Sequence, residues 1–504
     1  MSSLPPPGAL PRGVPPAAAD GHGRWVALAV VLVASLMDLL DVTIVNAAIP
    51  GIRRDLGAGY AAVQWVTVDY ALAFALLLIT GGRLGDIFGR RRLFLIGMAG
   101  FTAASGLCGI AWNADVLVWA RLLQGTMAAL MVPQVLAIIH VSFAAHERGR
   151  VYGRYGLVVG TAGICGPVLG GMLVERNLFG LEWRPVFLVN LPIGLIGLVL
   201  ARRYVHESKA PGALRLDLVG VGLAALGLFA LIYPLIHGRD RGWPVRDVVV
   251  MAASVPLLAL FVVYERYKTG KDGSPLVVLS LFRARSFASG LAVQLTFSVA
   301  IGILFLPWTL YLQLGLGWAP RRAGLMGIPL AVAVATAAGL SLQLLVPRFG
   351  RRVLQAGVLL MITGLACFTW QIDRHGTDMH YWSLALPLAL CGTGLGLVLA
   401  PLADIVLTDV PQADAGSASG LISTNVQLGN AFGVALTSVL FFDELGGRAG
   451  AGGQDFSRAF QHLLYWVIGV MAAVFTLMFA LPRHVRRPEP HHTAGAVHDG
   501  EPVT

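Results

Sequence analysis

The sequence predicts an all-α polytopic membrane protein, and three observations carry that prediction. Of the 504 residues, 56% are hydrophobic and only 13% are charged, against roughly 25% charged residues in soluble domains. The charges fall in short breaks between apolar stretches of about 20 residues, the length of a helix that crosses roughly 30 Å of hydrocarbon. Strands that face lipid would instead alternate in polarity, and the sequence shows no such alternation.

Apolar windows separated by polar residues predict about fourteen membrane-spanning helices. The first seven are predicted at residues 25–49, 62–81, 93–112, 115–139, 152–174, 184–201 and 216–236. The next seven are predicted at residues 246–265, 286–312, 323–346, 352–372, 382–403, 418–441 and 462–481. An even number of spans places both termini on one side. Lys and Arg are about twice as frequent on that side, so both termini are predicted to be cytoplasmic.

The composition excludes several classes of function. The net charge of +10 does not indicate a nucleic-acid partner, because the arginines lie in breaks between spans, where they orient a membrane protein. The four cysteines fall in apolar segments and lack metal-ligand spacing. The sequence has no GxxxxGK[ST] loop for ATP and no set of residues typical of a hydrolase. We therefore expect neither an enzyme nor a cofactor, and an ion gradient as the energy source.

An internal repeat predicts the domain organisation. The loop after the second predicted helix reads GRLGDIFGRRRLF, and the loop after the tenth reads VPRFGRRVL. Both loops join the second and third helices of a half if helices one to six and nine to fourteen are equivalent. The predicted domains are a disordered cytoplasmic tail at 1–24, a six-helix bundle at 25–201, a linker with two extra helices at 202–285, a second six-helix bundle at 286–481 and a cytoplasmic tail at 482–504.

Four motifs in this order and topology resemble those of the major facilitator superfamily, and of its fourteen-helix drug:proton antiporter branch, the EmrB/QacA type. The motifs are LDVTIVNAAIP at 40–50, GRLGDIFGRRR at 82–92, RLLQG at 121–125 and GPVLGG at 166–171. The resemblance covers nearly all of residues 25–481. It implies the major facilitator fold, with two six-helix bundles plus two inserted helices. It also implies a proton-coupled exporter of hydrophobic or cationic compounds, antibiotics among them, in the inner (cytoplasmic) membrane.

Three acidic residues lie well inside predicted spans, away from the helix ends, and an ionised Asp near the bilayer centre costs about 2.5 to 3.5 kcal/mol. Asp38 is at the midpoint of the first helix, Asp41 lies three residues further on the same face, and Asp69 is in the second helix. Asp41, Asp69 and Arg121 share a depth of roughly 9 to 12 Å below the outer ends of their helices. We therefore expect a carboxylate cluster in the first bundle, partly offset in charge by Arg121.

Burial and like charge both favour protonation, so at least one acid of this cluster is expected to bind a proton near neutral pH. A lipophilic cation and a proton would then compete for one negative site. The resemblance implies the same role for Asp41, and a part in proton coupling for Arg121. The alternative is a buried polar knot that only fixes helix packing.

The loop motif predicts a conformational latch. Asp86 adds nothing to the orientation signal, but it can face the positive N-terminus of the thirteenth helix, near Ser417. The resemblance implies that this acid helps to clamp the two halves on the cytoplasmic side. We expect the acidic loop of Asp404, Asp409 and Asp414 to meet Arg83 or Arg90 in that state. The predicted latch consists of Gly82, Asp86, Gly89 and Arg90.

The fifth predicted helix has glycines along one side, which allow another helix to approach closely. Its motif contributes Gly166, Pro167, Gly170 and Gly171, after Gly156, Gly160 and Gly163 earlier in the helix. Pro167 removes a backbone hydrogen bond and predicts a kink. The helix therefore predicts a sealed, hinge-like contact. By resemblance, this motif favours export over symport.

Polar residues within other spans are candidates for a cavity lining: Asn46, Gln124, Gln294, Asn425, Gln427 and Asn430. Their alternative role is hydrogen bonding between helices. The predicted partners are a small-molecule substrate, protons and the lipid bilayer, and the predicted oligomeric state is a monomer. The competing functions are a major facilitator importer (symporter) of a small metabolite and a lipid flippase.

Overall fold

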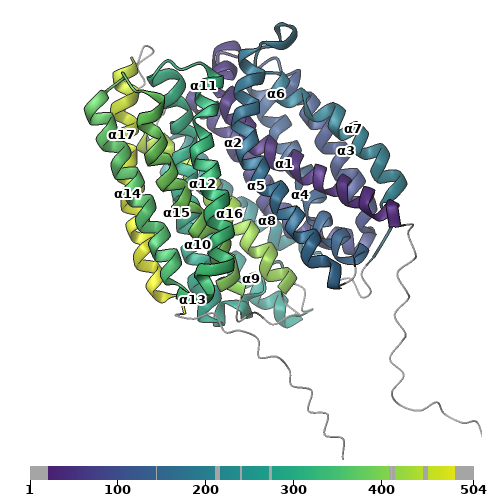
Figure 1. Ribbon diagram of the computed structural model, residues 1–504. Coiled ribbons are helices and arrows are strands. Elements are labelled where there is room, and N and C mark those ends of the chain that lie inside the picture. Colours follow the sequence, from purple (N-terminus) through teal and green to yellow (C-terminus); the bar gives the residue numbers. More distant parts are fainter. Residues whose placement is uncertain are drawn as a thin grey trace, which may run out of the picture.

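The computed structural model describes residues 21–143, 145–209, 216–238, 241–271, 275–407, 410, 415–445 and 452–482. Throughout this part of the chain the regular structure is helical, and Figure 1 shows two groups of helices side by side, the first half of the chain in purple and blue and the second in green and yellow. Most of the two predicted tails lies outside the described residues, as do Asp409 and Asp414.

The first half contains five long helices and the divided sixth span. Their bounds are α1 (Gly21–Asp55), α2 (Tyr60–Phe88), α3 (Arg90–Gly109), α4 (Ala114–Ser142), α5 (Ala145–Glu175), η1 (Leu178–Gly180), α6 (Pro185–Leu188) and α7 (Asn190–Tyr204). Two further helices, α8 (Leu218–His237) and α9 (Val245–Lys271), follow and pack against each other as a hairpin.

The second half repeats the order of long helices and adds short turns between them. Its elements are η2 (Leu279–Arg283), α10 (Arg285–Leu310), η3 (Tyr311–Gly315), α11 (Pro320–Leu325), α12 (Gly327–Leu340), η4 (Ser341–Leu345), α13 (Val346–Phe349), α14 (Arg352–His375), α15 (Tyr381–Leu407), α16 (Ala415–Leu440), α17 (Gly453–Leu477) and η6 (Met478–Ala480).

Twelve helices in the described part of the chain are long and apolar enough to cross a membrane. The protein is therefore an all-helical, multi-pass membrane protein. Helices α5, of 31 residues, and α16, of 26 residues, are not among the twelve, and both contain residues whose side chains lie outside the description. The described residues therefore account for twelve of the fourteen predicted spans.

Prolines divide two predicted spans that the hydropathy pattern leaves whole. The predicted helix at 184–201 breaks after Leu188, and the predicted helix at 323–346 breaks after Leu325. Pro192 and Pro329 each lie four residues further on, so the carbonyls of Leu188 and Leu325 receive no helical hydrogen bond. The ninth predicted helix, 286–312, ends instead in a π-helical turn, η3, which follows Pro307 and extends the element to Gly315.

The two halves meet along α2 and α16, which pack against each other over much of their length. Near the predicted outer side, the buried Gln64 side chain of α2 donates to the Val434 carbonyl at 3.2 Å and to Thr437 Oγ1 at 2.6 Å. The hydroxyl of Ser438 donates back to Gln64 Oε1 at 2.6 Å. Closer to the predicted cytoplasmic side, Thr424 Oγ1 donates to the Ala75 carbonyl at 3.2 Å. This contact is called the α2–α16 seam below.

The α8–α9 hairpin contacts both helices of this seam. Trp65 of α2 donates through Nε1 to His237 Nδ1 at 3.3 Å, and Ser438 of α16 donates to the Ile236 carbonyl at 3.2 Å. At the other end of the hairpin, Arg83 of α2 donates to the carbonyl of Pro275, just after α9. The hairpin is therefore fastened to the first half at both ends, and to the second half near the predicted outer side.

The second contact between the halves lies between α5 and α11. A Cβ atom on Gly171 of α5 would lie 2.8 Å from the carbonyl carbon of Pro320, and one on Gly324 of α11 would lie 3.0 Å from that of Pro167. Both distances are too short for a side chain, so these positions require glycine for helices at this separation. The backbone N–H of Arg321 also donates to the Glu175 carboxylate at 3.2 Å. This contact is called the α5–α11 seam below.

Candidate functional site

A cavity of about 330 Å³ lies between the two halves. It is lined from the first half by α1 and α5, and from the second by α10, η3, α11, α12 and α15. Its lining consists of Thr43, Asn46, Ala47, Pro167, Phe305, Trp308, Thr309, Leu312, Gln313, Ala323, Gly324, Gly327, Leu330, Ala331, Val334, Ala335, Leu388, Leu395 and Leu399. The volume is within the range of pockets that hold drug-sized ligands, roughly 300 to 1,000 Å³.

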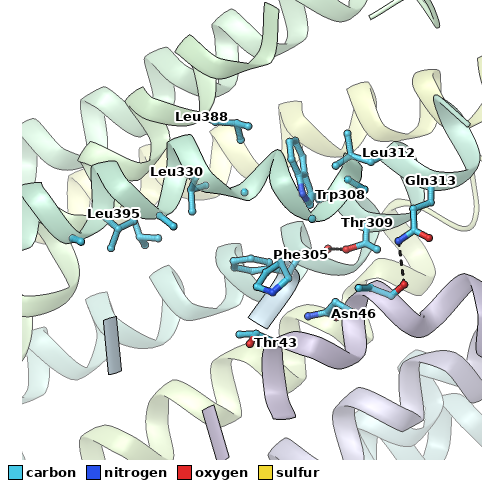
Figure 2. A pocket seen from close by; sticks show the side chains of 18 of the residues that line it. Thr43, Asn46, Phe305, Trp308, Thr309, Leu312, Gln313, Leu330, Leu388 and Leu395 are labelled. Carbon is cyan, nitrogen blue, oxygen red and sulfur yellow. Dashed lines mark hydrogen bonds between the residues drawn. The ribbon is translucent and has the colours of Figure 1, made fainter. Parts of the chain in front are cut away.

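Polar groups gather at one end of this cavity. Figure 2 shows Asn46, Thr309 and Gln313 close together, with Leu330 and Leu395 at the other end. Gln313 Nε2 donates across the cavity to the Ala47 carbonyl at 3.2 Å, which joins η3 to α1. The Asn46 side chain has no hydrogen-bond partner among the described residues, so its amide is available to a ligand.

A buried ion pair lies on the other side of α1. Asp41 has no exposed surface and pairs with Arg121 of α4, which is 1% exposed. The Asp41 carboxylate also accepts from Gln124 Nε2 at 2.8 Å and from Asn190 Nδ2 at 3.0 Å. Arg121 Nε donates to the Val66 carbonyl at 2.9 Å. The pair is therefore saturated with hydrogen bonds from four helices, as a charge pair removed from water requires.

The other two acids of the predicted cluster have weaker partners. Asp38 is 7% exposed and accepts a hydrogen bond from the Tyr70 hydroxyl. The guanidinium carbon of Arg121 lies 4.3 Å from the centroid of the Tyr70 ring, so Tyr70 contacts both Arg121 and Asp38. Asp69 is 8% exposed, and its carboxylate has no hydrogen bond to any described residue. The three acids thus differ in how far their charge is compensated.

The structure distributes the candidate lining residues over three places. Asn46 lines the cavity, and Gln124 lies in the network around Asp41. Gln294 is buried and donates to Ser298 Oγ at 3.3 Å, and Asn425 donates to the Leu291 carbonyl at 2.9 Å, so both bond within the second half. Gln427 and Asn430 are half-buried on α16, and the backbone of Asn430 lies against α10 at Gly302.

Comparison with known proteins now gives the family. The sequence pattern described as Major Facilitator Superfamily matches residues 31–434. The chain belongs to the major facilitator superfamily. A protein of Streptomyces coelicolor named "Probable actinorhodin transporter" is 42% identical over 451 residues, which are 90% of this chain and 77% of that protein. The "Multidrug resistance protein Stp" of Mycobacterium tuberculosis is 36% identical over 80% of this chain and 73% of its own.

Solved structures of the superfamily share the fold at low sequence identity. A bacterial homologue of the human lysosomal transporter Spinster, in an inward-facing and unoccupied conformation, superposes with a TM-score of 0.64. Its identity is 15%, and the superposition covers 92% of this chain and 98% of that one. In this superfamily the chain is a transporter rather than an enzyme.

The loop motif of this major facilitator protein folds around a helix break at Gly89. The φ angle of Gly89 is +113°, and a Cβ atom there would lie 2.6 Å from a carboxylate oxygen of Glu207. Across the break, Arg90 Nη2 pairs with Asp86 Oδ1 at 2.8 Å. Gly82 faces Pro133 of α4. Of the predicted partners of Asp86, Arg83 and Arg90, Asp409 and Asp414 lie outside the described residues, as do the side chains of Asp404 and Ser417.

The glycines of the fifth helix face two neighbours. Gly166 and Gly170 lie against α1, and Gly171 lies against α11 across the α5–α11 seam. Pro167 lies between them and lines the cavity. The side-chain positions of Gly156, Gly160 and Gly163 lie outside the described residues.

Sequence reasoning missed three residues of this architecture. Asn190 and Gln313 hold the ion pair and the cavity, and Glu207 caps α3 by accepting from the backbone N–H groups of Arg91 at 3.1 Å and Arg92 at 3.2 Å. A carboxylate at the N-terminus of a helix compensates both the free N–H groups and the helix dipole. Glu207 is visible in the sequence only as an acid after the sixth span, and no nearby residue indicates that its partner is the start of α3.

Replacing Glu207 by glutamine is expected to lower the stability of the protein by about 1 kcal/mol, because the cap loses its charge but keeps an acceptor. Replacing it by alanine removes both and is expected to cost about 2 kcal/mol. Thermal unfolding in detergent measures both. Glu182, an exposed acid at the predicted outer side, provides the matched control in a Glu182→Ala variant. An alanine variant at 207 as stable as that control would contradict the cap.

Proposed function

We propose that this chain is a proton-coupled exporter of toxic hydrophobic compounds, antibiotics among them, in the cytoplasmic membrane. The names of the relatives support the substrate, since they describe antibiotic transport and multidrug resistance. In the proposed arrangement α5 and α16 also cross the membrane, which makes fourteen spans with both termini cytoplasmic. Their lengths of 31 and 26 residues correspond to about 46 and 39 Å of helix, more than the roughly 30 Å of hydrocarbon.

The observation that carries the proposal is that one helix serves two sites. Asp41 of α1 is held in the ion pair with Arg121, whereas Thr43 and Asn46 of the same helix line the cavity. Residues 41 and 46 are five positions apart, so their side chains point about 140° from each other around the helix. A change at the ion pair therefore moves the cavity wall through the body of α1.

Proton binding supplies such a change. A proton on Asp41 removes the counter-charge of Arg121, and an unpaired buried guanidinium is costly, by about 3–5 kcal/mol when one partner of such a pair is lost. Asp38 lies one turn away on the same face of α1 and accepts a hydrogen bond from Tyr70, against whose ring Arg121 packs. In the proposed exchange Arg121 leaves protonated Asp41 and turns towards Asp38, and α1 shifts with it.

This exchange links the proton to the direction of opening. Two contacts close the cavity near the predicted outer side. Gln313 of η3 bonds to the Ala47 carbonyl of α1, and Gly171 of α5 packs against α11. Both α1 and α5 line the cavity. Gly166 and Gly170 pack α5 onto α1, so a shift of α1 is transmitted to the α5–α11 seam. Two discrete arrangements of α1, one for each protonation state of Asp41, would give the alternating access that an antiporter requires.

The test is the accumulation of Nile red, an uncharged fluorescent dye, in bacteria that express the chain. Expressing cells are expected to hold less dye than cells with the empty vector, and an uncoupler that collapses the proton gradient is expected to remove the difference. More dye in expressing cells would favour the importer. A difference that survives the uncoupler would refute proton coupling. A resistance profile across structurally varied antibiotics, in the same strains, would then give the range of substrates.

A further inference from the structure

The sequence leaves open whether the substrate is a lipophilic cation or an uncharged molecule, and the cavity bears on this choice. Among the described residues that line it, none is charged. Asp41, the acid nearest along α1, has no exposed surface, and its oxygens are taken by Arg121, Gln124 and Asn190. Asp38 and Asp69 are buried outside the lining. Within the part of the chain that the structure describes, a ligand in the cavity therefore meets no negative side chain.

An organic cation in this cavity would lose its hydration without gaining a counter-charge. Burying a charge in that way disfavours binding by about a hundredfold or more. Trp308 and Phe305 offer ring faces, but a desolvated cation–π contact typically contributes roughly thirtyfold, less than the loss from burying the charge. The aromatic lining does not offset the loss, so the cavity favours a molecule that is uncharged when bound.

The polar end of the cavity indicates what such a molecule carries. The Asn46 amide is free of protein partners among the described residues and offers both a donor and an acceptor. Pro50 lies four residues after Asn46 and has no N–H, so the Asn46 carbonyl also receives no helical hydrogen bond. Gln313 keeps its side-chain oxygen as an acceptor, because its hydrogen bond to the Ala47 carbonyl uses the amide nitrogen. These groups match a carbonyl or hydroxyl on the edge of an apolar ring system.

We propose that the cavity selects an uncharged, largely apolar aromatic molecule whose carbonyl or hydroxyl group is read by Asn46 and Gln313, and that it rejects permanent cations. This proposal rests on the proposed function for its transport role, but it concerns binding alone. Asn46 and Gln313 are then the specificity-determining residues, one from each half. A ligand held between them bridges α1 and η3 at the position of the existing Gln313 bond to Ala47.

The experiment measures binding to the full chain in lipid nanodiscs by quenching of tryptophan fluorescence. The probes are hydroxyanthraquinone in its uncharged form and tetraphenylphosphonium, a permanent cation. We expect the neutral probe to bind at least about tenfold more tightly than the cation. Replacing either Asn46 or Gln313 by leucine is expected to weaken the neutral probe about three- to tenfold, the effect of one hydrogen bond. Equal affinity of the wild-type chain for both probes would overturn the proposal.

Asn46→Asp gives the sharper result, because it adds a charge at nearly constant volume. This variant is expected to gain tetraphenylphosphonium binding by about tenfold or more and to reverse the preference. Asn177→Asp adds the same charge on the exposed turn after α5 and is expected to leave both affinities unchanged. An Asn46→Asp variant that behaves like the Asn177→Asp control would also overturn the proposal, provided that both elute as folded monodisperse protein.

The outcomes separate this inference from the proposed function. If the neutral probe binds with the expected preference but expressing cells do not exclude Nile red, the inference stands and the export function fails. If the cells exclude the dye in a proton-dependent manner but both probes bind equally, export stands and the charge selectivity fails.

Discussion

Asp41→Asn is expected to abolish uphill export while leaving the chain in the membrane. In the proposed exchange the Asp41 carboxylate releases Arg121 when it binds a proton. An asparagine can neither pair with Arg121 as a counter-charge nor bind that proton. In inverted membrane vesicles with an imposed pH gradient, we expect accumulation of a transported compound to fall at least about a hundredfold, to the level of vesicles without the protein. Gradient-driven accumulation that persists in Asp41→Asn would remove the proposed coupling.

A double variant separates the loss of proton coupling from the loss of stability. Asp41→Asn leaves Arg121 buried without its counter-charge, which is expected to cost about 3–5 kcal/mol. Adding Arg121→Gln removes the orphaned cation, so the double variant is expected to recover most of that loss in thermal unfolding. It is still expected to lack gradient-driven transport, although it should exchange substrate across the membrane when no gradient is present. Recovery of gradient-driven transport in the double variant would contradict the assignment.

The second large effect is expected at Gly171, in the α5–α11 seam. In Gly171→Val the new side chain would meet the carbonyl carbon of Pro320 at 2.8 Å and the Cα of Arg321 at 2.9 Å. These are backbone atoms that cannot turn aside, so α5 and α11 must part. Overpacking of this kind costs about 1–3 kcal/mol, which would shift the balance towards the state open at the predicted outer side by roughly five- to 150-fold.

Accessibility of the cavity measures this shift. In a variant in which Cys108, Cys165, Cys367 and Cys391 are replaced, Asn46→Cys places one thiol in the cavity. A membrane-impermeant maleimide added from outside is expected to label it at least about fivefold faster when Gly171→Val is also present. Gly339→Val is the matched control, because a Cβ atom there has no neighbour within 4 Å. Equal labelling in the two backgrounds would argue that this seam does not close the outer side.

The sequence predicted the features that depend on length, hydropathy and depth. Apolar stretches placed the long helices, and the common depth of Asp41 and Arg121 predicted that they lie near each other, as they do in the structure. Asn190 was missed because it lies inside the predicted span at 184–201, where an asparagine is typical of a hydrogen bond between helices, and its partner Asp41 is 149 residues away. No local pattern reports a contact over that distance.

The cavity was harder to predict because its walls depend on backbone irregularities. Gln313 lies one residue beyond the end of the ninth predicted helix, and the π-turn of η3 is what brings it and Leu312 together into the lining. The lining residues of α12 are Gly, Leu, Ala and Val, which hydropathy cannot distinguish from residues that face lipid. Gln294 and Asn425 were predicted as cavity-lining candidates because they are polar residues within spans. In the structure both form hydrogen bonds within the second bundle.

The α8–α9 hairpin makes the two sides of the molecule mechanically unequal. The hairpin braces the α2–α16 seam, because it bonds to α2 through Trp65 and Arg83 and to α16 through Ser438. In the described part of the chain, no such element bonds to both α5 and α11. We expect the two halves to hinge about the braced α2–α16 seam and to separate at the α5–α11 seam. We therefore expect cargo to leave by the opposite edge, where glycine backbones touch and little has to be broken.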